Sequence, residues 1–176
     1  MRKFAGVCLA AAMLLPVGLI AASPAGAVAG ASCAKLTGTA NLKPGLSNTA
    51  TLNKPTITIK NAKLSGCTGG VTTGTLSATL KYTIPSNCLG QATGKSSGIK
   101  GTATVVWNDK STSTLSIKLV GVTKKPTETT IPGTVTAGKF KGSKTSGTTI
   151  YTLATGECSA KPFTTATFKN LTKIVI

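Results

Sequence analysis

The stretch 102–120, TATVVWNDKSTSTLSIKLV, carries the strongest signal for the fold. On both sides of the turn residues Asn108-Asp109-Lys110, apolar side chains alternate with hydroxyl-bearing or basic ones. Successive side chains of a strand point to opposite faces, so this alternation makes one face apolar and the other polar. The stretch therefore predicts a β-hairpin, with Thr102–Asn108 and Ser111–Val120 as strands and Trp107 near the end of the first.

The alternation is clearest in 115–119 of this stretch and recurs in 56–60 and 80–84, and helical periodicity is nearly absent. Glycine- and proline-rich turns separate the runs, while 91–100 and 124–130 are expected to be loops. The apolar end of 164–176 predicts a terminal strand that pairs within the core. About eight to ten strands at this spacing are typical of a sandwich or a barrel. We expect a single antiparallel β-sandwich over 32–176, immunoglobulin-like or a related Greek key.

Residues 1–31 have the pattern of a secretory signal peptide. Arg2 and Lys3 precede an apolar run, and small residues then predict cleavage after Ala27 or Ala31. No second hydrophobic run follows, so we expect no transmembrane segment in the mature chain. Lipidation of Cys33 stays open as an alternative, although Gly30 fits the usual lipoprotein signal poorly.

An exported chain with an even number of cysteines is expected to form disulfides. The residues after the leader contain four, which allow three pairings: Cys33, Cys67, Cys88 and Cys158. We favour Cys33–Cys67, at the ends of an early strand pair, together with Cys88–Cys158, which would join the middle of the chain to its C-terminal region. Their spacing is too wide for the close pairs of a structural zinc site.

Composition argues against an enzyme. The 176 residues contain no His and only 3 acidic residues. Ser-His-Asp and Cys-His catalysis and His-ligated metals are therefore excluded, and carboxylate metal cages are disfavoured. We expect no catalytic residue, no metal and no cofactor.

The lysines are the feature that points to a partner. Without Arg2 and Lys3, 18 lysines face 3 acids, a formal net charge of +15. Lys139 and Lys141 are expected to share one strand face, because they are two residues apart. The candidate polyanion-binding residues, chosen from clusters along the sequence, are Lys60, Lys63, Lys124, Lys125, Lys139, Lys141 and Lys144.

Several short segments resemble small, uncharacterised secreted β-rich proteins of actinobacteria. They are Cys33 with GTA at 38–40, LSGCTGG at 64–70, TVVWN at 104–108 and GKFKG at 138–142. The resemblance implies an exported, disulfide-bonded β-sandwich. It transfers no active site.

The sequence thus predicts a non-enzymatic, basic protein that is secreted or associated with the cell envelope. Its expected partners are anionic cell-wall polymers or acidic glycans, contacted by lysines. The alternative is an immunoglobulin-like adhesion module that binds another surface protein, with charge serving only solubility. Sequence-specific nucleic-acid binding is not expected, because residues 28–176 contain no Arg for bidentate contacts and offer no aromatic stacking platform.

Overall fold

The computed structural model describes residues 30–48, 53–88, 98–122, 125–153, 158 and 161–176, which form eleven strands. Five long strands come first: β1 (Ser32–Leu46), β2 (Thr56–Thr68), β3 (Thr73–Tyr82), β4 (Ile99–Trp107) and β5 (Thr112–Val122). Six shorter strands follow: β6 (Lys125–Thr130), β7 (Gly133–Gly138), β8 (Lys144–Thr145), β9 (Thr148–Leu153), β10 (Phe163–Asn170) and β11 (Ile174–Val175).

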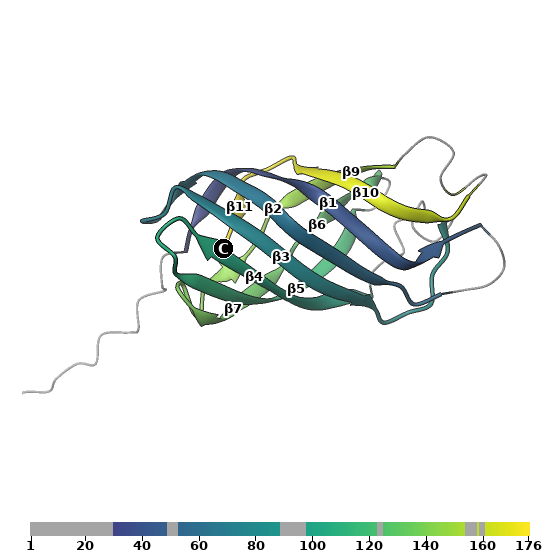
Figure 1. Cartoon of the computed structure of the whole chain (residues 1–176), viewed down its shortest axis with the longest axis horizontal. Coiled ribbons are helices and arrows are strands. Elements are labelled where there is room, and N and C mark those ends of the chain that lie inside the picture. Colours follow the sequence, from purple (N-terminus) through teal and green to yellow (C-terminus); the bar gives the residue numbers. More distant parts are fainter. Residues whose placement is uncertain (1–29, 49–52, 89–97, 123–124, 154–157, 159–160) are drawn as a thin grey trace, which may run out of the picture.

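The sheet closes on itself as a barrel (Figure 1). Strands β1 to β5 pair in chain order, β1 then pairs with β10, β10 with β9, β9 with β6, and β6 with β5. Because β5 pairs with both β4 and β6, eight strands form a ring without free edges. The all-β class is confirmed, but the expected sandwich with immunoglobulin-like or Greek-key order is corrected to a barrel. The alternation of apolar and polar residues determines that one face of the sheet is buried. It does not determine whether that face packs against a second sheet or is enclosed by closure of the same sheet.

The wall opposite the long strands has two tiers. The first half of β5, Ser113–Ile117, pairs with β7, whereas Val120–Val122 pair with β6. Strand β1 divides in the same way, with Ser32–Cys33 on β11 and Thr37–Leu46 on β10. One tier therefore consists of β10, β9 and β6, and the other of β11, β8 and β7.

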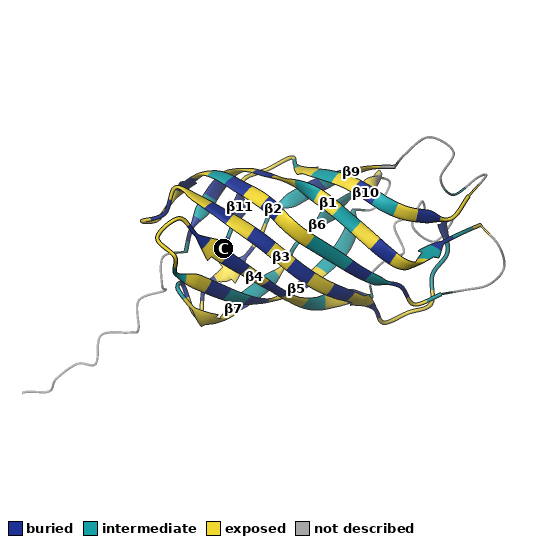
Figure 2. Ribbon diagram, in the orientation of Figure 1, coloured by how far each residue is buried: buried dark blue, intermediate teal, exposed yellow. Residues whose placement is uncertain are grey.

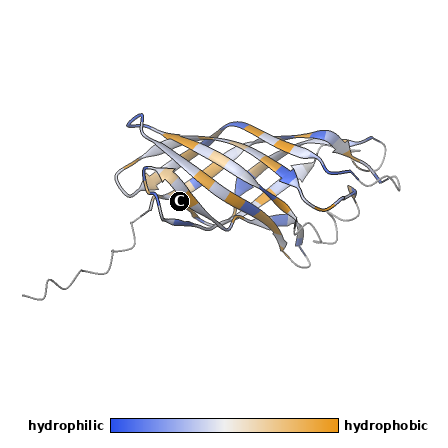
Figure 3. Cartoon of the chain, turned by 90° about the horizontal axis from the view of Figure 1, so that it is seen from below, coloured by the Kyte–Doolittle hydropathy of each residue, from blue (hydrophilic) through white to orange (hydrophobic). Residues whose placement is uncertain are grey.

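Strand β3 shows most plainly how the sequence makes an inside and an outside. Its buried residues alternate with exposed ones without a break, as in Leu80 (0% exposed) beside the exposed Lys81 (Figure 2). Apolar and polar residues alternate in the same way along the strands in Figure 3. The core thus lies inside the ring, and hydroxyl and lysine side chains cover the outside.

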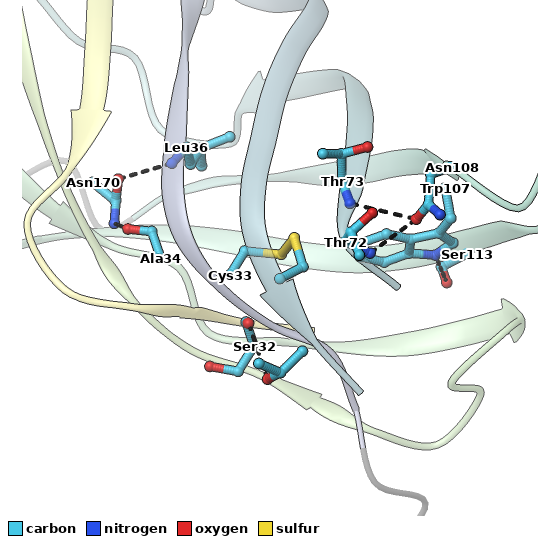
Figure 4. Close-up of a disulfide and its surroundings, with 12 residues drawn as sticks. Ser32, Cys33, Ala34, Leu36, Thr72, Thr73, Trp107, Asn108, Ser113 and Asn170 are labelled. Atoms are coloured by element: carbon cyan, nitrogen blue, oxygen red, sulfur yellow. Dashed lines mark hydrogen bonds between the residues drawn. A yellow bond between two sulfur atoms is a disulfide. The ribbon is translucent and has the colours of Figure 1, made fainter. Parts of the chain in front are cut away.

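Both expected disulfides are confirmed. Cys33 and Cys67 face each other across β1 and β2, with an S–S distance of 2.08 Å (Figure 4). Cys88 and Cys158 form the second bond. The Cys33 sulfur is thereby occupied, so it cannot also carry a thioether lipid. Two disulfides indicate a protein that folds in an oxidising environment.

At the boundary between the two tiers, the side chain of Asn170 is hydrogen-bonded to β1 (Figure 4). Its side-chain Oδ1 accepts a hydrogen bond from the Leu36 amide at 2.8 Å, and its Nδ2 donates to the Ala34 carbonyl at 2.8 Å. The side chain lies where β1 stops pairing with β10, at Thr37, and before it pairs with β11, at Cys33. It therefore replaces the ladder bonds that are missing at this step.

The predicted hairpin is confirmed as β4 and β5. Trp107 is 2% exposed, and its Nε1 donates to Ser113 Oγ at 2.8 Å (Figure 4). Its ring meets that of Phe140 edge-on, with the ring centres 5.5 Å apart. Across the sheet it faces Gly74, where a Cβ would lie 2.9 Å from the indole. The glycine thus leaves the space that the indole fills.

Two other expectations are partly corrected. Residues 125–130 are a strand, β6, and not a loop, because their backbone pairs with both β5 and β9. Residues 91–97 lie outside the described residues, and Ile99–Lys100 already belong to β4. The terminal run does pair within the core, but as β10 and β11, and it ends on the buried Ile176.

Among the described residues, no helix has the length and hydropathy that crossing a bilayer requires.

Candidate anion-binding face

Three lysines lie directly opposite one another on the outside of the long-strand wall. Lys81 on β3 pairs in register with Lys100 on β4, which pairs in turn with Lys118 on β5. Lys81 also pairs with Thr56 on β2, and Thr56 with Lys43 on β1. One line across five adjacent strands thus carries four lysines, which we call the lysine row.

The lysine row is exposed, and among the described residues it takes part in no ion pair. All four of its side chains are exposed. Within the described part of the chain, the two ion pairs use other lysines: Lys125 with Glu128 at 3.1 Å, and Lys139 with Asp109. In the described part of the chain, the row is therefore a strip of positive charge without an ion-pair partner.

A second line, of hydroxyl and amide side chains, runs beside the lysine row. Its members pair in register from β1 to β5: Asn41, Thr58, Thr79, Thr102 and Ser116. A shallow hollow over β2, β3 and β4 includes three of these residues and is bordered by Lys60. Lysine charges and hydrogen-bonding hydroxyls therefore adjoin on one face.

The lysines chosen from the sequence are scattered by comparison. Lys60 and Lys63 are both exposed on β2, on either side of a bulge at Asn61, which has a φ of 55°. Lys125 is engaged by Glu128, and Lys124 lies outside the described residues. The part these lysines play in anion binding stays a prediction.

The expectation that Lys139 and Lys141 share a strand face is wrong. Strand β7 ends at Gly138, and both lysines lie in the turn that follows, with Phe140 between them at a φ of 64°. Lys139 also lies 5.4 Å from the centre of the Phe140 ring. Lys141 is exposed in that turn, while Lys144 on β8 donates a hydrogen bond to Thr134 at 3.1 Å. Period-two reasoning fails here because the backbone is not extended.

Asp109 serves its own hairpin turn. The Lys139 ammonium donates to its Oδ2, and the Ser111 hydroxyl and amide donate to its Oδ1. These hydrogen bonds, that of Lys139 foremost, lower the pKa of Asp109 from 3.8 to about 2. The carboxylate is thus a fixed turn residue.

Among the described residues, no group of His, Cys, Asp or Glu is placed to hold a metal ion. In the barrel wall, burial raises the pKa of the Tyr151 hydroxyl above its ordinary value. Comparison of the chain with protein-family models, curated proteins and solved structures gives no match. The lysine row was missed by sequence reasoning, although the symmetry of the hairpin about Asp109 already places Lys100 opposite Lys118.

Proposed function

We propose that this protein is a secreted, non-enzymatic binder of anionic cell-envelope polymers, and that the lysine row is its binding surface. The observation that carries the proposal is the direct alignment of Lys81, Lys100 and Lys118 on adjacent strands. The target is a linear polymer with repeated phosphate or carboxylate groups, lying across the strands.

The alignment is unfavourable for the free protein. Adjacent strands are about 4.8 Å apart, so like charges directly opposite repel, within the Debye length of about 8 Å at physiological salt. Lysines that served only solubility would not need to face one another on adjacent strands. If lysines and threonines alternated from strand to strand along this line, the positive charges would lie farther apart. A polyanion across the row would remove the repulsion and release its own counterions.

Lysine side chains are better suited to contacting a flexible anionic polymer than to recognising the edges of nucleic-acid bases. An ammonium group is a compact charge with rotatable donors, whereas the planar fork of Arg gives bidentate recognition. The hydroxyl line beside the row adds donors for phosphate or sugar oxygens. Charge without bidentate donors supports recognition of a repeating anion over recognition of a nucleotide sequence.

Retention on isolated Gram-positive cell walls, with and without teichoic acids, tests the proposal across a sodium chloride series. The row variant K81Q/K100Q/K118Q is compared with K54Q/K161Q/K173Q, which removes the same charge from exposed lysines outside the row. We expect the row variant to lower the slope of log affinity against log salt by about two to three, and the control variant by less than about one.

Two results would overturn the proposal. Equal losses in the two variants would mean that net charge alone matters, and no retention of the wild type at low salt would leave the lysines as solubilising groups. Stability gives an independent readout: the row variant should gain roughly 0.2–1 kcal/mol relative to the control variant, because the cross-strand repulsion is gone.

The proposed function requires export, and the structure bears on where the expected leader would be cleaved. The leader itself lies outside the described residues, but Ala31 is 0% exposed and its carbonyl accepts a hydrogen bond from the Ile176 amide at 2.8 Å. Cleavage after Ala27 would keep this contact, whereas cleavage after Ala31 would remove it. We therefore expect the exported chain to begin at Val28, which the intact mass of the secreted protein would reveal.

A further inference from the structure

The barrel encloses a cavity that its own side chains do not fill. Its volume is about 120 Å³, and every one of the eight barrel strands contributes to its lining. Protein interiors are normally packed with few voids larger than a water molecule. A void of this size is therefore a feature that the fold maintains at some cost to its stability.

The burial of the lining residues agrees with an unfilled interior. Leu80 lines the cavity and is 0% exposed, as expected for a packed core. Ala40, Leu119 and Phe168 line it too, yet they remain only partly buried. Part of the surface of these side chains is thus not covered by other side chains.

The two walls of the cavity differ in chemistry. The long-strand wall contributes mainly aliphatic side chains such as Leu36 and Leu76. The tiered wall also contributes apolar side chains, such as Phe168 and Ile174, and adds the hydroxyl groups of Thr129, Thr145 and Thr149. Ser146, at the junction between the tiers, also lines the cavity. A ligand would therefore meet a mainly apolar lining that carries several hydroxyl groups on the tiered wall.

Two of these hydroxyls already donate their hydrogens to backbone carbonyls. Thr145 Oγ1 donates its hydrogen to the Ile131 carbonyl at 3.1 Å, and Thr149 Oγ1 donates to the Thr129 carbonyl at 3.3 Å. Because each hydrogen is already used, the oxygen lone pairs remain for a donor. The tiered wall is thus suited to a ligand that carries a hydroxyl hydrogen.

We infer that the barrel interior binds a small, uncharged molecule with one ring and one hydroxyl group, such as an alkylated phenol. An apolar cavity of about 150 Å³ lined by Leu, Ile and Phe is known to accept benzene, so one ring suits the size. None of the lining residues is charged, and a charged ligand would lose its hydration without compensation. This site is internal and separate from the lysine row.

Isothermal titration calorimetry with p-cresol and with toluene tests the inference. The variant A40L fills the cavity from β1, whereas A137L makes the same change on the exposed face of β7. We expect A40L to weaken p-cresol binding at least tenfold and A137L to change it by less than twofold. Equal effects of the two variants would place the binding elsewhere and overturn the inference.

T149V tests the hydroxyl wall. It should weaken p-cresol several-fold and leave toluene within twofold, since only p-cresol donates a hydrogen bond. If T149V weakened the binding of both probes equally, Thr149 would not form a hydrogen bond with the hydroxyl group of the ligand. That result would overturn this part of the inference.

A measurement on the wild type guards against a variant that fails to fold. With p-cresol, the methyl NMR signals of lining residues such as Leu36, Leu76 and Ile117 should shift, and that of the exposed Val106 should not. Shifts confined to surface methyls, or no binding up to millimolar p-cresol, would overturn the inference. The row variant K81Q/K100Q/K118Q should bind p-cresol like the wild type, so failure here and failure of polyanion binding are distinguishable.

Discussion

The long-strand wall and the tiered wall of the barrel show what strand length does for a fold. Strands β3 and β4 pair over nine consecutive positions without a shift, whereas β8 and β11 contain two residues each. Pairing without a shift from β3 through β4 to β5 sets Lys81, Lys100 and Lys118 in register. The tiered wall is interrupted, and its hydroxyls line the cavity. Regular pairing thus organises the outer face, while interrupted pairing leaves room inside.

The largest expected loss of stability comes from removing the disulfides, one at a time. In the chain-entropy model each is worth about 4 kcal/mol, and C88A/C158A should cost slightly more than C33A/C67A, because its loop spans 70 residues against 34. Cys33 and Cys67 also lie on strands that pair along most of their length. Guanidinium unfolding midpoints would measure both, and a larger loss in C33A/C67A would contradict this order.

Truncation of a large side chain should cost more stability on the long-strand wall than on the tiered wall. W107A removes a fully packed indole and should cost about 3–5 kcal/mol. F168A removes a ring that is only partly buried beside the cavity and should cost about 1–2 kcal/mol. Urea unfolding of both variants checks this. Equal losses would show that the tiered wall is packed as tightly as the long wall.

The side-chain amide of Asn170 stabilises the place where β1 changes its partner from β10 to β11. N170A should cost about 1–3 kcal/mol, because it leaves the Leu36 amide and the Ala34 carbonyl without their partner. N41A is the matched control, since its Oδ1 makes only a 3.4 Å contact with Thr165, and it should stay within about 0.5 kcal/mol. Thermal unfolding of the pair compares them, and a cost for N41A as large as for N170A would refute the assignment.

The smallest expected effect is at the turn of the long-wall hairpin. The Asp109 carboxyl should titrate near 2, below its ordinary 3.8, and K139Q should move its pKa back toward 3.8. A lowered pKa means that the contribution to stability is present above 3.8 and disappears as the pH falls through 2. Carboxyl carbon NMR shifts would follow this titration, and a wild-type pKa near 3.8 would disprove the lysine contact.

Prediction from the sequence worked for the alternating hairpin, for the apolar C-terminal run and for the cysteine pairing. The β4–β5 hairpin, the buried end at Ile176 and both disulfides were expected and are present. The prediction of a loop at 125–130 failed because β6 lacks apolar alternation and exists through its pairing with β5 and β9. The expectation that Lys139 and Lys141 share a strand face failed because β7 ends at Gly138 and both lysines lie in the turn that follows.

The sequence by itself determined the alternation, the charge excess and the even number of cysteines, since these are properties of neighbouring residues and of composition. Only the tertiary structure decided the closure of the barrel, the register that aligns Lys81, Lys100 and Lys118, and the cavity. The physical reason is that alternation assigns each side chain to a face but leaves open which strands meet. Pairing of β5 with β4 on one side and β6 on the other settles that, and with it both candidate sites.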